Sequence, residues 1–479
     1  MLATLDILQS IPVLSFLPGV MLAMVSLFPT RQLGVEIGSV VLIFTGQVWN
    51  MAFSFYASLK AIPRELREAA NIYRFGRVQR FLELELPYGT IGLIWNSMVS
   101  VAGGWFFLMA CEMFVLGKRD FRLPGLGSYL QAAASAGDMH ALLWGLAAMI
   151  LLIVLIDQLV WRPAIAWADK FKMEQVEGGE SAESPVLDLL RQSPLATRFV
   201  ERAIARPTER LILHAARRPA AGHPSQSRVR LFQAVRMALA GLLTLLLAVA
   251  VFEAFRTLRG ISGAEFLRTF AAAGATFLRV FAALILGSLW TIPAGVAIGF
   301  NPRLSRIAQP LAQIAASVPA TALFPVVLMA LISLGGGLRA GSVLLMLMGT
   351  QWYILFNVIA GATAIPSEFR EVSEIFRFSR LDRWRTVILP GIFPYLLTGL
   401  VTASGGAWNA SIVAEYFQFK GQVMSTFGLG SEISAATDAG NFPVLLLATV
   451  VMAILVVSIN RLLWRPLYRV AEQRFRLET

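Results

Sequence analysis

The 479-residue chain has few of the side chains on which most enzyme chemistry depends. It contains one cysteine and three histidines, which excludes an internal disulfide and a zinc site built from four cysteines. Cys111 stands alone, and His140, His214 and His223 are far apart in the sequence. No segment matches the Walker A pattern G-x-x-x-x-G-K-[ST]. We therefore expect no enzyme activity, no metal and no cofactor in this chain.

Charged residues are also scarce, at 15% of the chain against 57% apolar residues. Soluble proteins carry about 25% charged residues. Several apolar runs reach the length of about 20 residues that crosses a hydrocarbon core of ~30 Å. The predicted spans are 11–29, 35–57, 88–111, 141–160, 232–255, 274–299, 311–333, 340–361, 391–414 and 441–463. The predicted fold class is an all-α polytopic membrane protein with about ten transmembrane helices.

The net charge of +12 would suggest a nucleic-acid partner in a soluble protein. Here the lysines and arginines collect in the loops between spans, as the positive-inside rule requires. Residues 60–80 alone hold six basic side chains, which places that segment in the cytoplasm. The expected surroundings are membrane lipid, and no nucleic acid is expected.

About 115 residues of the chain recur at a fixed offset of 303. The residues Trp49, Pro63, Pro87, Trp105, Glu112 and Gly125-Leu126-Gly127 recur as Trp352, Pro366, Pro390, Trp408, Glu415 and Gly428-Leu429-Gly430. Six predicted spans separate the two charged segments, and an even number returns both to the same side of the membrane. The repeat is therefore predicted to be parallel, unlike the inverted repeats of many secondary transporters.

The two copies differ in length. The second has two predicted spans before its Ser317-Val318-Pro319 segment, whereas almost nothing precedes Ser10-Ile11-Pro12 in the first. We expect a first domain at 1–165 that is truncated at its N-terminus and has four spans. We expect a second domain at 231–479 with six spans, and a cytoplasmic linker at 166–230 that is rich in Arg, Glu, Ser and Pro. The linker is either an amphipathic surface helix near 195–216 or a solvated tether.

A densely charged stretch follows the second predicted span of the first copy. Residues 61–87 are identical to 364–390 at thirteen of 27 positions. Pro63 and Pro366 suit the first turn of a helix, and the acidic residue that follows each proline suits its positive end. Topology alone would require basic residues but not the same pattern twice. The pattern predicts a helix that lies on the cytoplasmic face and docks a partner.

These residues resemble the EAA loop of permeases of ATP-binding-cassette (ABC) importers. That loop has the pattern E-A-A-x-x-x-G, then nine residues, then I-x-L-P. The spacing fits Glu68-Ala69-Ala70 with Pro87, and Glu371-Val372-Ser373 with Pro390. Both copies have an arginine in place of the pattern's glycine, which leaves the shape of that turn open. The resemblance assigns ATPase coupling to Glu65, Arg67, Glu68, Ala69, Ala70, Arg74, Pro87, Glu368, Arg370, Glu371, Arg377 and Pro390.

Further segments are similar to permeases of the nitrate/sulfonate/taurine importer group. They are Phe277-Leu278-Arg279-Val280, Ser317-Val318-Pro319, Leu323-Phe324-Pro325, Ala414-Glu415 and Gly428-Leu429-Gly430. The resemblance covers residues 9–170 and nearly all of 263–470. It implies two fused type I permease domains in a bacterial inner membrane, coupled to two cytoplasmic ABC ATPase subunits. It also implies a periplasmic or lipid-anchored solute-binding protein that delivers a small anion of the nitrate or sulfonate type.

Polar residues and glycines inside equivalent spans are candidates for the translocation path. They are Ser100, Gly103, Gly104, Trp105, Glu112, Ser404, Gly405, Gly406, Trp408, Asn409 and Glu415. The glycines serve either close helix packing or an open lining. The glutamates lie near the outer ends of their spans. Each has either a functional role, because a carboxylate within the membrane is costly, or simple access to water.

Two other classes of protein stay open. A secondary active transporter would need an ion-coupling cluster inside the bundle, and a membrane-embedded enzyme would need clustered His, Asp or Cys. Co-purification with an ATPase separates an importer permease from both.

Overall fold

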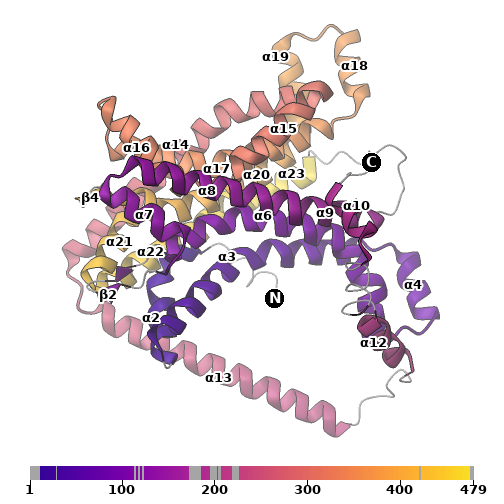
Figure 1. Ribbon diagram of the computed structural model, residues 1–479, viewed down its shortest axis with the longest axis horizontal. Helices are drawn as coiled ribbons and strands as arrows, with labels where there is room; N and C mark the ends of the chain where they lie inside the picture. Colours follow the sequence, from indigo (N-terminus) through magenta and orange to yellow (C-terminus); the bar gives the residue numbers. More distant parts are fainter. Residues whose placement is uncertain are drawn as a thin grey trace. The chain divides into compact units, whose positions relative to one another are not determined.

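A computed structural model describes residues 11–28, 30–112, 115–116, 119–120, 123–171, 185–194, 202, 206–217, 226–419 and 422–474. Nearly all of this chain is helical, with two short β-hairpins (Figure 1). The first elements are α2 (Leu17–Leu27), α3 (Arg31–Ala61), α4 (Arg64–Ile72), α5 (Arg77–Arg80), α6 (Leu86–Glu112), β1 (Val115–Leu116), β2 (Arg119–Asp120), α7 (Leu126–Ala136), α8 (Met139–Ile156) and α9 (Arg162–Ala168).

The next elements are α10 (Pro185–Gln192), α12 (Arg206–Arg217), α13 (Gln226–Leu258), α14 (Gly263–Phe300), α15 (Pro302–Ser317), α16 (Ala320–Ser333) and α17 (Leu338–Thr363). The chain continues through α18 (Ser367–Ile375), α19 (Arg380–Arg383), α20 (Leu389–Ala414), β3 (Tyr416–Phe419), β4 (Gln422–Ser425), α21 (Leu429–Ala439), α22 (Phe442–Ile459) and α23 (Arg465–Arg474).

The chain forms two compact units. One comprises Met1–Thr45, Ala102–Ile150 and Arg256–Thr479, and the other comprises Gly46–Val101 and Leu151–Phe255. The charged pair α4 and α5 belongs to the second unit, whereas α18 and α19 belong to the first. Each unit therefore holds one copy of the charged segment.

The predicted all-α polytopic class is confirmed. Within the described residues, eight helices are long and apolar enough to cross a membrane, and one bent pair brings the count to nine. The eight are α3, α6, α8, α13, α14, α17, α20 and α22. Each corresponds to one of the predicted spans.

Two of the ten predicted spans are not single regular helices. The run at 311–333 is broken into α15 and α16, which meet at 87°. Val318 has extended backbone angles because it precedes Pro319, which begins the second arm. The run at 11–29 yields only a 3₁₀ turn and the 11 residues of α2, a helix of roughly 16 Å that is shorter than a hydrocarbon core.

The repeat extends to fine detail. The elements from α3 to α9 recur as α17 to α23 in the same order. Each span α6 and α20 is preceded by a π-helical turn, at Phe81–Glu85 and Trp384–Ile388. A second pair of π-helical turns, Asp157–Trp161 and Asn460–Trp464, follows α8 and α22. Two copies of one structural unit are the simplest cause of such irregularities at one offset.

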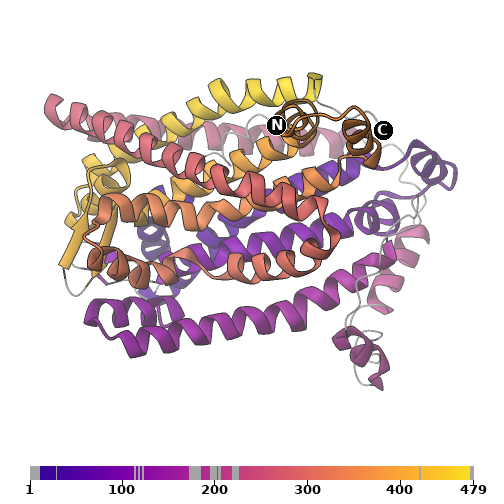
Figure 2. The same cartoon turned by 90° about the horizontal axis from the view of Figure 1, so that it is seen from above.

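The core of the first unit is built on α17, which packs against α14 and α20 (Figures 1 and 2). Glycines allow these helices to approach closely. A Cβ atom added at Gly295 would lie 2.7 Å from Val358, and one at Gly399 would lie 3.0 Å from the carbonyl oxygen of Tyr353. α18 and α19 stand out beyond the ends of α17 and α20 (Figure 1).

The predicted linker at 166–230 contains two described helices. α10 packs against α9, and α12 packs against α5. Both helices are amphipathic, with charged residues on one face and apolar residues on the other. Most of the segment at 195–205 lies outside the described residues.

Candidate functional site

The two charged segments fold into the same helix–turn–helix unit. α4 and α18 are each nine residues long and follow Pro63 and Pro366. Each helix ends in a turn closed by two backbone hydrogen bonds. In the first, the N–H of Phe75 donates to the carbonyl of Ala70 over 2.9 Å, and the N–H of Arg74 donates to Asn71 over 3.0 Å. The second copy repeats both hydrogen bonds 303 residues further along the chain.

This turn requires a residue with left-handed backbone angles. Arg74 has a φ of 53° and Arg377 has a φ of 48°. Glycine is the usual residue at such a helix end, since a side chain there costs roughly 1–2 kcal/mol. The EAA pattern has its glycine at this position. The arginines therefore preserve the shape of the turn at the expense of backbone strain.

The third residue of the pattern faces the protein in both copies. Ala70 is 4% exposed and Ser373 is 3% exposed, so the second copy keeps a small side chain where space is limited. The second residue is less buried: Ala69 is half-buried and Val372 is 45% exposed. The loss of both alanines in the second copy therefore leaves the buried contact small and changes mainly the outer surface.

Arg67 holds α4 against the end of α3. Its Nη2 donates to the carbonyl oxygens of Leu59 and Lys60, over 2.6 and 3.2 Å. A cation at a helix C-terminus is favourable, and these carbonyls have no partner within the helix. The hydroxyl of Tyr88 donates to the carbonyl of Ala61 over 2.9 Å at the same end. Arg67 therefore positions the segment.

The remaining predicted coupling residues lie either on the exposed surface of the charged segments or at the start of the span that follows each segment. The side chains of Glu65, Glu68, Glu368 and Glu371 are exposed. The half-buried Pro87 and Pro390 stand in the first turns of α6 and α20, where a missing N–H costs nothing. For Arg370 the described structure gives only the backbone, within α18.

Glu415 lies at the outer end of α20 and is completely buried. Its Oε1 pairs with Nη1 of Arg279 at 2.7 Å, and its carboxylate accepts a hydrogen bond from the hydroxyl of Thr276. Its Oε2 accepts from the N–H of Gly430 over 2.9 Å, in the first turn of α21. The N-cap of α21 is Gly428, which has no side chain to cap it. Glu415 therefore supplies the cap and joins α14, α20 and α21.

Glu112 has the same position at the end of α6 and is 8% exposed. Its Oε2 accepts from the N–H of Gly127 over 2.6 Å, at the start of α7. The Gly-Leu-Gly segments follow from this packing. A Cβ atom at Gly125 would lie 2.2 Å from Glu112, and one at Gly428 would lie 2.3 Å from Glu415. Both glutamates thus bond to backbone.

One face of α20 is open. Thr398, Thr402 and Gly405 are exposed, and a Cβ atom at Gly405 would have no neighbour within 4 Å. Asn409 continues this face one turn further and accepts a hydrogen bond from the N–H of Leu14 over 3.3 Å. The spacing i, i+4, i+7, i+11 places all four on one side of the helix. Sequence reasoning found Gly405 and Asn409 but missed the threonines, which the same spacing could have indicated.

The other path candidates are packed. Trp408 is 1% exposed, and Ser404 and Ser100 are 3% exposed. Gly104 is buried and Trp105 is half-buried. A Cβ atom added at Gly103 would lie 3.5 Å from the hydroxyl oxygen of Tyr353 on α17, and one at Gly406 would lie 3.5 Å from the ring of the same residue. These residues join helices and do not lie on the open face of α20.

A cavity of about 170 Å³ lies near the outer end of that face. Both copies of the repeat contribute to its lining, through Leu17 and Gln131 from one copy and Tyr416 and Asp438 from the other. The hydroxyl of Tyr416 donates to the carboxylate of Asp438 over 2.6 Å, so this polar pair is internally satisfied.

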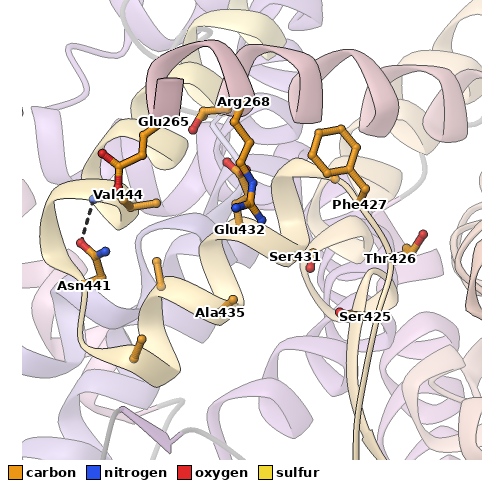
Figure 3. A pocket seen from close by; sticks show the side chains of 14 residues that line it. Glu265, Arg268, Ser425, Thr426, Phe427, Ser431, Glu432, Ala435, Asn441 and Val444 are labelled. Atoms are coloured by element: carbon orange, nitrogen blue, oxygen red, sulfur yellow. Dashed lines mark hydrogen bonds and ion pairs between the residues drawn. The ribbon is translucent and has the colours of Figure 1, made fainter. Parts of the chain in front are cut away.

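A larger cavity of about 480 Å³ lies at the outer ends of α14, α21 and α22 (Figure 3). The side chains of Arg268 and Glu432 face each other within it, with Nε and Oε1 3.2 Å apart. Glu265 caps α14 by accepting from the N–H and the hydroxyl of Ser262. The cavity therefore has a charged lining, and it lies at the end of the first unit that is opposite α18 and α19.

The fold and these sites define a multi-pass α-helical membrane protein made of two repeats, each with an exposed, charged helix pair. The sequence matches the family described as the binding-protein-dependent transport system inner membrane component, over residues 1–160 and 287–476. The chain belongs to this family. It is accordingly a multi-pass protein of the bacterial inner membrane, and the two matched regions confirm the tandem repeat.

Three relatives illustrate the similarity. The chain is 26% identical over 178 residues to the nitrate import permease protein NrtB of Leptolyngbya laminosa, covering 37% of this chain and 60% of that protein. It is 28% identical over 156 residues to the bicarbonate transport system permease protein CmpB of Synechococcus elongatus, covering 33% and 53%. It is 28% identical over 173 residues to the taurine transport system permease protein TauC of Escherichia coli, covering 36% and 59%. The matches therefore span between about half and three fifths of these relatives.

Proposed function

We propose that this chain is the permease subunit of a binding-protein-dependent ABC importer. The observation that carries the proposal is the exposed helix–turn–helix unit that occurs twice, as α4–α5 and α18–α19, with the same turn and the same exposed glutamates. A single copy would serve one partner. Two copies on one chain suit two ATPase subunits that act together.

The cargo is a small anion of the nitrate, bicarbonate or sulfonate class, by analogy with the relatives of similar sequence. Its path follows the open face of α20, where Thr402 and Gly405 offer a hydroxyl and exposed backbone within a mainly apolar span. Closure of the two ATPase subunits moves both helix pairs together and rocks the spans between inward-open and outward-open states. The charged outer cavity beside Arg268 faces the solute-binding protein.

Charge reversal tests the docking role. Glu68→Arg combined with Glu371→Arg should release the ATPase or uncouple hydrolysis from transport. The reason is that reversing a charge at an interface brings like charges together, which weakens the binding free energy by roughly several kcal/mol. Each single change should have a milder effect. The measurements are ATPase pull-down and stimulated hydrolysis with the chain reconstituted in vesicles.

The number of copies of each subunit in the complex gives an independent test of the proposal. Native mass spectrometry of the wild-type complex should show one copy of this chain with two ATPase subunits. Two copies of this chain per complex would contradict the proposal. So would normal assembly and normal coupled transport by the double charge-reversal variant, since the repeated charge would then serve membrane topology alone.

A further inference from the structure

The turns after α4 and α18 contain the only residues other than glycine that have a positive φ in the described part of the chain, Arg74 and Arg377. They occupy equivalent positions in the two copies. Glycine or asparagine would adopt the same conformation at lower cost. A strained residue that persists at the same place in both copies indicates that its side chain has a task.

That task is not met within the described chain. Both arginine side chains are exposed, and neither has a hydrogen bond or an ion pair with a described residue. Membrane topology does not require them at these positions, because Arg77 and Arg380 are also exposed and supply positive charge three residues later, without left-handed backbone angles.

Each arginine follows two apolar side chains that are unusually exposed. Ile72 and Tyr73 are 76% and 75% exposed, and Ile375 and Phe376 are 74% and 70% exposed. An aliphatic residue, an aromatic residue and an arginine therefore stand together, exposed, at the turn after α4 and at the turn after α18. Aromatic and arginine side chains dominate the binding energy of protein interfaces once a partner desolvates them.

We propose that these two tips, Ile72–Tyr73–Arg74 and Ile375–Phe376–Arg377, enter an apolar-walled acidic site on each ATPase subunit, where each guanidinium pairs with a carboxylate. This inference rests on the proposed function and names the residues that determine docking. The left-handed backbone fixes the direction in which the Cα–Cβ bond of each arginine leaves the turn. A planar guanidinium that binds a carboxylate through two donors benefits from a fixed direction, whereas a diffuse layer of anionic lipid does not require one.

The test separates charge from strain in the full-length chain. Arg74→Asn with Arg377→Asn removes the charges and relieves the strain, whereas Arg74→Lys with Arg377→Lys keeps both. The matched control, Arg77→Gln with Arg380→Gln, removes two exposed charges from the neighbouring positions. Affinity is measured for the ATPase that co-purifies with the wild-type chain, in nanodiscs at low and high salt. Stability is measured by chemical unfolding in detergent.

We expect the asparagine variant to resist unfolding better than wild type and to bind the ATPase at least about tenfold more weakly, with a smaller salt dependence. The lysine variant should lose less affinity, and the glutamine control should bind almost as wild type does. Equal binding by the asparagine variant, or an equal loss in the glutamine control, would overturn the inference. So would a loss that occurs only in nanodiscs containing phosphatidylglycerol, which would indicate contact with lipid. Failure of the wild-type chain to bind any ATPase would instead reject the proposed function.

Discussion

The buried carboxylate of Glu415 gives the sharpest prediction about the fold. Glu415→Ala removes the ion pair with Arg279 and the cap on α21. Arg279, whose side chain is 15% exposed in the wild-type chain, then keeps among the described residues only the hydroxyl of Thr426, at 3.0 Å. Removal of one partner from a buried ion pair costs about 3–5 kcal/mol. We expect the free energy of unfolding to fall by about that amount.

Glu112→Ala provides an internal comparison. Its side chain bonds to the N–H of Gly127 and lacks a counterpart of the Arg279 contact among the described residues. Loss of one hydrogen bond to a charged group costs about 1.5–3 kcal/mol. Chemical unfolding in mixtures of dodecyl sulfate and a mild detergent should therefore rank Glu415→Ala below Glu112→Ala. Glu36→Ala, at an exposed position on α3, should unfold as wild type does.

The same experiment distinguishes a structural carboxylate from one that contacts cargo. Glu415→Gln keeps the volume and most hydrogen bonds, so it should lie between alanine and wild type in stability. If Glu415→Ala unfolds like wild type but abolishes transport in reconstituted vesicles, the carboxylate acts on cargo and the structural reasoning is refuted.

Two smaller predictions concern glycines and the open face of α20. Gly428→Ala should destabilise the protein by about 1–3 kcal/mol, because the new Cβ atom would lie 2.3 Å from Glu415, whereas Gly405→Ala meets no atom within 4 Å and should leave unfolding in detergent unchanged. Thr402→Val should reduce uptake of cargo several-fold, roughly, without weakening ATPase binding, because it removes an exposed hydroxyl within the span. Uptake of labelled nitrate, bicarbonate and taurine measures this change, and unaltered uptake of all three would argue against a path along this face.

The sequence predicted most spans and the repeat because both depend on composition and spacing. Hydropathy shows that a segment is apolar but not whether it forms one straight helix. The run at 311–333 therefore gave no sign that its two arms meet at 87°. The local signal was present in Val318-Pro319, since a residue before proline avoids helical angles. The left-handed turn at Arg74 was hidden for a related reason. An arginine is not expected to have left-handed backbone angles. Only the alignment of Arg74 with the glycine of the EAA pattern indicated this conformation.

Contacts between distant segments could not be predicted from the sequence. Glu415 meets Thr276 and Arg279 across more than 130 residues of chain. Periodicity identifies which residues share a face of one helix, but it does not say which helix covers that face. The role of the Gly-Leu-Gly segment became clear only when the glutamate was found against it.

The two copies differ on the face of α20 along which we propose that cargo passes. The glutamates at the ends of α6 and α20 and the glycines beside them are the same in both copies. On the open face of α20, Thr398, Thr402 and Asn409 are polar, whereas the equivalent residues of α6 are Trp95, Val99 and Phe106. Because a duplicated path would start with equal walls, this difference indicates that the second copy supplies the polar contacts. A cargo-contacting role should therefore be sought first on α20.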